Sequence, residues 1–218
     1  MYVEYNEVHW KLLGFMRARA LRILSKLEEI SQTGFVYGSL ARGDVNRDSD
    51  IDVVVLNPNV IVLDLLEVNH KFIVQATPTS TPKAYLSLDP EEREVISFPL
   101  SKLKRHEEDF YRFGGMVSRK DIEDKVRVPG VNKKLELIVP IPEGHVQLPL
   151  LGNEDVAVKY LGISIASLTL RERLLNRRRE KGRTGVFLRY DLSRDESIEG
   201  AVRDLSKNNK FFRRSVGD

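Results

Sequence analysis

The chain has 218 residues, of which 41% are apolar and 31% charged, and its formal net charge is +3. This composition provides enough apolar material for a folded core and excludes a disordered chain. The absence of cysteine excludes disulfides, thiolate zinc sites and cysteine nucleophiles. No run approaches the ~18 apolar residues that span a bilayer, and no signal peptide is visible. We therefore expect a cytoplasmic protein without membrane contact.

Hydrophobic spacing predicts alternating helices and strands over the first 140 residues. The predicted helices cover residues 8–30, 60–69 and 101–113. The predicted strands cover residues 35–37, 51–56, 72–77 and 135–139, and residues 84–88 and 94–98 form a hairpin around Asp89-Pro90. This order indicates an α/β or α+β layer.

The last third of the chain differs in charge from the rest. Residues 151–218 contain 15 basic and 10 acidic residues, a net charge of +5. Helices are predicted over 155–161 and 164–181, a strand over 186–190, and a helix with a loose tail over 194–218. The predicted domains are therefore 1–149, a basic segment at 150–192 that is helical or a winged helix-turn-helix, and a charged tail at 193–218.

One short segment carries a chemical signal. Gly38 follows a predicted strand and allows a tight turn with close approach of a ligand. Ser39 could cap the next helix, and a helix start of this kind is a natural phosphate site. Arg42, one turn later, could add a charge-assisted bond to a phosphate.

Two carboxylates follow at alternating positions. Asp50 and Asp52 begin the strand predicted at 51–56, so their side chains should point to the same side of a sheet. Paired carboxylates repel each other unless a cation neutralises them. Oxygen ligands favour Mg²⁺ or Mn²⁺, with substrate phosphates completing the shell. The segment thus predicts metal-assisted chemistry on a nucleoside triphosphate.

Gly38-Ser39, a spacer of ten residues, and Asp50-Ile51-Asp52 together resemble the signature of DNA polymerase β-like nucleotidyltransferases. Arg42-Gly43 and Asp48-Ser49 are similar to the small, minimal members of that superfamily. The resemblance implies a mixed-sheet α+β fold with helices on the sheet, ATP or another nucleoside triphosphate as substrate, and Mg²⁺. It also implies that Asp50 and Asp52 hold the metal while Gly38, Ser39 and Arg42 hold the phosphates.

The resemblance further implies a third acid on a neighbouring strand, acting as a metal ligand or general base. Glu136 is the best candidate because it lies alone among apolar residues of a predicted strand. Other candidates are four acids, Asp64, Glu67, Asp89 and Glu94. A solvent-facing acid on an edge strand would give the same pattern as Glu136.

The basic segment resembles a helix-turn-helix, with Gly162 at the turn and Ser164 as the cap of the second helix. That second helix carries five arginines that could contact a nucleic acid: Arg171, Arg173, Arg177, Arg178 and Arg179. Residues 182–190 could form a wing. Alternatively, the helix packs its leucines on the first domain and its arginines are solvated.

The predicted function is Mg²⁺-dependent transfer of a nucleoside monophosphate, AMP from ATP in the simplest case, to an acceptor hydroxyl. The acceptor could be a protein, an RNA end or a small molecule. Two alternatives keep the fold without this activity: a nucleotide-sensing, DNA-binding regulator, and an antitoxin-like partner of a toxin.

Overall fold

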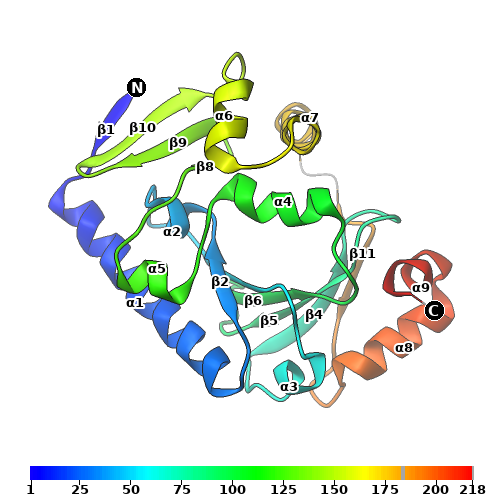
Figure 1. The fold of residues 1–218 in the computed structure, drawn as a ribbon. Helices are drawn as coiled ribbons and strands as arrows, with labels where there is room; N and C mark the ends of the chain where they lie inside the picture. Colours follow the sequence, from blue (N-terminus) through cyan, green and yellow to red (C-terminus); the bar gives the residue numbers. More distant parts are fainter. Residues whose placement is uncertain (183–184, 218) are drawn as a thin grey trace. The chain divides into compact units, whose positions relative to one another are not determined.

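The computed structural model describes residues 1–182 and 185–217, and the side chain of Arg179 lies outside this description. Figure 1 shows the elements along the chain. Contacts divide the chain into two units that each combine distant segments. Unit 1 comprises residues 1–24, 35–51 and 105–184, and unit 2 comprises residues 25–34, 52–104 and 185–218. The mixed α+β fold predicted from the sequence is confirmed.

Unit 1 contains most of the helices. They are α1 (Glu7–Glu29, which continues into unit 2), α2 (Ser39–Arg42), α4 (Arg105–Gly114), α5 (Arg119–Glu123), α6 (Glu154–Leu161) and α7 (Ile165–Lys181). An antiparallel sheet has the order β1-β10-β9-β8, formed by Tyr2–Glu4, Gly144–Pro149, Glu136–Ile141 and Gly130–Val131. Strands β2 (Gly34–Tyr37) and β7 (Met116–Val117) pair antiparallel.

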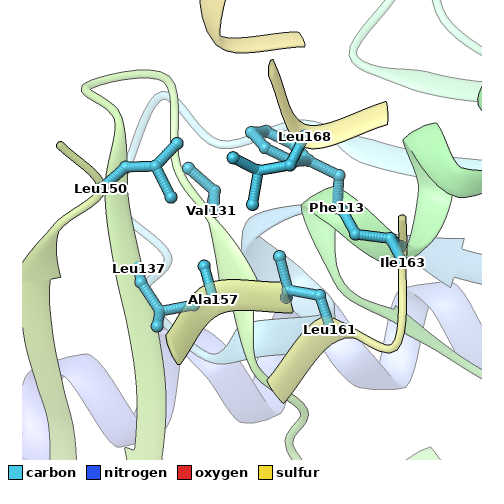
Figure 2. Packing of buried hydrophobic residues seen from close by; sticks show 8 residues of the cluster. All are labelled: Phe113, Val131, Leu137, Leu150, Ala157, Leu161, Ile163 and Leu168. Atoms are coloured by element: carbon cyan, nitrogen blue, oxygen red, sulfur yellow. The ribbon is translucent and has the colours of Figure 1, made fainter. Parts of the chain in front are cut away.

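A hydrophobic cluster holds α6 and α7 in unit 1. Leu168 of α7 and Ala157 of α6 are fully buried among side chains from α4, β8 and β9 (Figure 2). The connection is the one expected from the sequence, because Gly162 adopts a left-handed conformation and the Ser164 side chain accepts a bond from the Ser167 N–H. The helix pair of the basic segment is thus a packed part of unit 1.

Unit 2 contains a sheet with the order β11-β4-β5-β6-β3. These strands are Leu188–Asp191, His70–Gln75, Lys83–Ser87, Glu94–Pro99 and Ile51–Val55, and the helices are α3 (Val60–Asp64), α8 (Ile198–Asn208) and α9 (Lys210–Val216). The predicted hairpin is confirmed, with Tyr85 opposite Ser97. Val53, Val54 and Val55 are completely buried, in line with the apolar strand predicted at 51–56.

Two expectations for the C-terminal third need correction. Strand β11 pairs antiparallel with β4, so the strand expected in a wing belongs instead to the sheet of unit 2. Arg183 and Thr184, also expected in the wing, lie outside the described residues. The expected loose tail contains α9, because Asn209 caps that helix and Phe212 is fully buried. No helix among the described residues is long and apolar enough to cross a membrane.

Candidate active site

The turn between β2 and α2 has the open backbone expected of Gly38. Its φ is +86°, a value that favours glycine, and a Cβ placed there would meet no atom within 4 Å. The Gly38 N–H donates to the carbonyl of Gly115 at 2.9 Å, which fixes the turn. Since α2 is a single turn, any phosphate binding would rely on Ser39 and local N–H groups rather than on a helix dipole.

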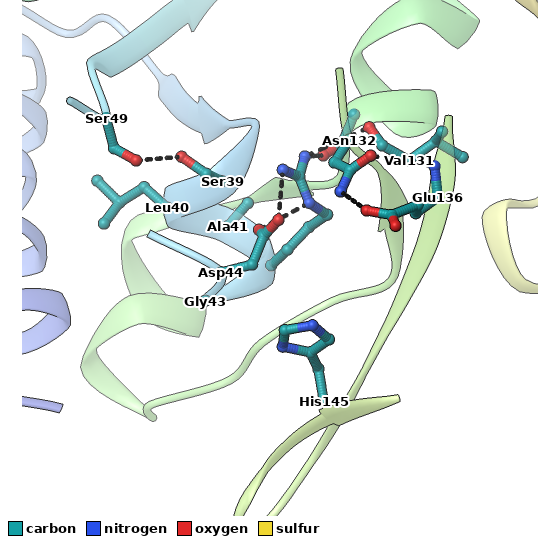
Figure 3. A network of polar contacts seen from close by, with 12 residues as sticks. Ser39, Leu40, Ala41, Gly43, Asp44, Ser49, Val131, Asn132, Glu136 and His145 are labelled. Atoms are coloured by element: carbon teal, nitrogen blue, oxygen red, sulfur yellow. Dashed lines mark hydrogen bonds and ion pairs between the residues drawn. The ribbon is translucent and has the colours of Figure 1, made fainter. Parts of the chain in front are cut away.

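The segment that leads into β3 folds back onto this turn. The Ser39 hydroxyl donates to the Ser49 hydroxyl at 3.3 Å (Figure 3). The Ser49 hydroxyl in turn accepts a bond from the Asn46 N–H. Ser49 directly precedes Asp50. The fold therefore holds the beginning of the acidic segment beside the Gly38-Ser39 turn.

Asp50 and Asp52 flank a buried residue at the start of β3. Both are half-buried, whereas Ile51 between them is 3% exposed. Because side chains alternate along a strand, this pattern places the two carboxylates on the accessible side. Burial raises the pKa of Tyr85 to about 12, and the negative charge of Asp52 contributes to this rise as the second cause.

Glu136 lies in the four-stranded sheet of unit 1. Its carboxylate accepts a bond from the side-chain amide of Asn132 at 2.8 Å (Figure 3). It accepts a second bond from the side-chain amide of Gln147 at 3.2 Å. Across the described parts of the chain, no three His, Cys, Asp or Glu side chains gather closely enough to hold a metal ion. The metal-binding and catalytic roles of Glu136 stay predictions.

Two of the other candidate acids have structural partners. Asp64 pairs with the Lys71 ammonium at 2.7 Å and accepts a bond from the Ile198 N–H at 2.9 Å. Asp89 accepts bonds from the N–H groups of Arg93 and Glu94, which close the hairpin turn. These contacts give Asp64 and Asp89 structural roles, so neither residue needs a catalytic role to account for its position.

Arg42 is 5% exposed and forms part of a buried network. It makes a fork with Asp44, at 2.9 Å and 3.1 Å, and donates to the carbonyl of Gly114 at 2.6 Å. A Cβ at Gly130 would lie 2.5 Å from the Gly114 carbonyl oxygen and 2.7 Å from the Arg42 Cδ, so the close approach of the Gly114 backbone requires glycine here. Phosphate binding by Arg42 stays a prediction, while these contacts give it a role in positioning the turn.

Sequence reasoning missed Arg17, which supports the other end of α2. It is 7% exposed and donates to the carbonyls of Leu40, Ala41 and Val126 at 2.8–3.3 Å. Burial and the charge of Arg127 lower the pKa of Arg17 to about 10. The signal was present, because Arg17 falls on the apolar side of the first helix, between Leu13 and Ala20.

The arginines predicted on α7 have different environments. The Arg171 guanidinium lies 4.4 Å from the centre of the Phe110 ring, and its Nε is buried without a hydrogen-bond partner. Burial, and then the charge of Arg178, lower the pKa of Arg171 to about 10. Arg173, Arg177 and Arg178 are exposed, unlike Arg171.

Comparison with known protein families gives a match over the region that contains the Gly38-Ser39 turn. Residues 17–128, just over half of the chain, match the nucleotidyltransferase domain. The chain belongs to the nucleotidyltransferase domain family. The matched region of this nucleotidyltransferase includes Arg17, the Gly38-Ser39 turn and the Asp50-Asp52 pair, and it ends before Glu136. No curated protein matches the chain.

Proposed function

We propose that this nucleotidyltransferase moves a nucleoside monophosphate from a nucleoside triphosphate, ATP in the simplest case, to an acceptor hydroxyl. One observation carries the proposal: the contact between Ser39 and Ser49 keeps the Gly38-Ser39 turn beside the start of the carboxylate-bearing strand. A triphosphate held at this turn would lie next to Asp50.

The donor set fits a divalent metal. Asp50 and Asp52 offer carboxylate oxygens on the accessible side of the strand, the ligands that Mg²⁺ and Mn²⁺ prefer. When bound, the metal would supply charge neutralisation at the phosphates and would lower the cost of bringing the two carboxylates together. Phosphate oxygens and water would complete the shell, because only two acids come from this strand.

The residues would then have separate tasks. Gly38 and Ser39 would hold the β- and γ-phosphates, and the α2 turn would stay in place through Arg42 and Arg17. The acceptor oxygen would form a bond to the α-phosphorus while the bond to the bridging oxygen breaks, and pyrophosphate would leave. The acceptor proton would pass to Glu136 or to water.

The test is incubation of the purified chain with ATP labelled at the α-phosphate, Mg²⁺ and cell extract. We expect label on one class of acceptor, and its chemistry names the substrate. The Asp50→Asn/Asp52→Asn variant should lose the transfer by at least a hundredfold. The matched control is Asp124→Asn/Asp204→Asn, which removes two exposed carboxylates that pair with lysines and should transfer normally.

Failure has three distinct forms. Binding of ATP without label transfer would refute the enzyme and support a nucleotide-sensing regulator. A chain that binds neither ATP nor Mg²⁺, but forms a tight complex with a second protein, would support the antitoxin-like alternative. Transfer at the wild-type rate by the Asp50/Asp52 variant would move the site elsewhere.

A nucleic acid is the acceptor class favoured by one further observation. Arg173, Arg177 and Lys181 recur at four-residue spacing on α7, and all three are exposed. Such a basic stripe suits a phosphate backbone. A protein acceptor would make this stripe unnecessary for transfer, so the label experiment decides between them.

A further inference from the structure

A row of side chains crosses the sheet of unit 2 and ends near Asp52. Phe72 of β4 lies opposite Tyr85 of β5, and Tyr85 lies opposite Ser97 of β6. Strand β6 lies between β5 and β3, and the Ser97 hydroxyl donates to the carbonyl of Val53 at 3.2 Å. Since Val53 follows Asp52, the row from β4 to β6 reaches the level of that carboxylate.

The inner part of this row is a rigid stack. The rings of Phe72 and Tyr85 are 4.9 Å apart and within 3° of parallel. The Arg189 guanidinium covers the Phe72 ring at 4.1 Å from its centre, and it is held by Glu92 at 2.6 Å and Asp191 at 2.8 Å. With its ring held in this stack, Tyr85 has little freedom to move its hydroxyl.

In this row, the Tyr85 hydroxyl is the polar group that makes no hydrogen bond to another described part of the protein. It has no hydrogen-bond partner in the described part of the chain. The Tyr85 side chain is half-buried. The Ser97 hydroxyl, in contrast, is buried and bonded to Val53. Tyr85 also lies within electrostatic reach of Asp52 and stays protonated at any assay pH near neutrality.

Strand β6, the neighbour of β3 in this unit, carries one acid, Glu94, at its first position. Glu94 uses its own N–H to close the turn at Asp89. Opposite Tyr85 the strand has Ser97 instead of an acid. The group that this row presents toward Asp52 is therefore a neutral hydrogen-bond donor.

We propose that Tyr85 is a substrate-contacting residue, whose hydroxyl donates a hydrogen bond to a phosphate oxygen of the nucleoside triphosphate held at Asp52. A neutral donor suits this place, because it can meet a phosphate oxygen without repelling it and without adding a charge beside the carboxylate pair. The proposal rests on the proposed function, which supplies the nucleotide.

The decisive variant is Tyr85→Phe, which removes the hydroxyl and keeps the ring stacked on Phe72. We expect kcat/KM for ATP to fall about tenfold, the loss of one such bond, with an unchanged unfolding midpoint. The matched control is Tyr190→Phe, whose hydroxyl bonds only to Glu196 at 2.8 Å and should leave kcat/KM unchanged. Values for Tyr85→Phe within twofold of wild type would overturn the proposal.

The binding of Mg²⁺-ATP separates this proposal from the proposed function. If the wild-type chain binds Mg²⁺-ATP but transfers nothing, the transfer reaction is refuted, and a tenfold weaker Kd for Tyr85→Phe would still support the contact. An unchanged Kd in that case would overturn it. A wild-type chain that binds no Mg²⁺-ATP would overturn both.

Discussion

The arginines around the Gly38-Ser39 turn and the exposed arginines of α7 are used in opposite ways. Arg17 and Arg42 are at most 7% exposed and direct their donors at backbone carbonyls and one carboxylate. Arg173 and Arg177 are exposed on a helix that is packed through its leucines. The same residue type therefore serves as an internal support in one place and as an available charge in the other, a difference that charge counting does not reveal.

Removing Arg42 should have the largest effect. Arg42→Met leaves Asp44, whose side chain is 13% exposed, buried without its cation. Breaking one side of a buried pair costs about 3–5 kcal/mol, so we expect the free energy of unfolding in urea to fall by that amount. Arg42→Met/Asp44→Asn should lose less, because no uncompensated charge remains. A loss below about 1 kcal/mol in the single variant would mean that the pair is solvated in solution.

Removing Arg17 should have the next largest effect. Arg17→Met leaves the carbonyls of Leu40 and Ala41 without their buried donor, and we expect a loss of about 2–3 kcal/mol. Because these carbonyls belong to α2, binding of Mg²⁺-ATP should weaken as well. Arg19→Met, two residues away and exposed, is the control and should stay within about 0.5 kcal/mol of wild type. Equal losses in both variants would contradict the special role of Arg17.

The contrast also marks what the sequence could predict. The Gly38-Ser39 turn, the strand after Asp50 and the first helix depend on local spacing and turn chemistry, and they were found. The pairing of β11 with β4 joins residues more than a hundred positions apart, so local patterns placed that strand in a wing instead. Short edge strands such as β1 and β8 have too few residues for a periodic signal.

The side-chain environments were harder to predict than the elements. Arg42 was expected to face a phosphate because of its distance from Gly38, but its fork with Asp44 depends on where Gly114 and Gly130 come close to it. Arg171 belongs to the same basic run as Arg173, yet only Arg171 lies over Phe110. Composition fixes the number of charges, whereas tertiary packing decides which of them remain available.

Changing the exposed arginines of α7 should affect binding but not stability. For Arg173→Ala/Arg177→Ala we expect the free energy of unfolding to stay within about 0.5 kcal/mol of wild type. If α7 contacts duplex nucleic acid, the slope of log K against log salt should fall by about 0.9 for each lost phosphate contact. Lys120→Ala/Lys207→Ala removes two exposed charges from other helices and should leave the slope unchanged. An unchanged slope in the α7 variant would show that its arginines are only solvated.

Arg189 is intermediate between these two groups, and its effect on stability should be smaller than those of Arg42 and Arg17. Its hydrogen bond, followed by that of His70, lowers the pKa of the half-buried Glu92. A carboxyl whose pKa is lower in the folded state stabilises the fold above its unfolded pKa of about 4.3 and loses this effect as the pH falls through the folded value. Since Arg189 is 40% exposed, solvent limits the contribution of this ion pair to the free energy of unfolding to about 0.5–1 kcal/mol.

The Glu92→Gln variant should therefore be less stable than wild type at pH 7, and the two stabilities should converge in acid. The control is Glu91→Gln, at an exposed position, which should match the stability of wild type at every pH. A gap between wild type and Glu92→Gln that persisted unchanged at pH 3 would mean that the stack of Arg189 on Phe72 needs the shape of the acid rather than its charge.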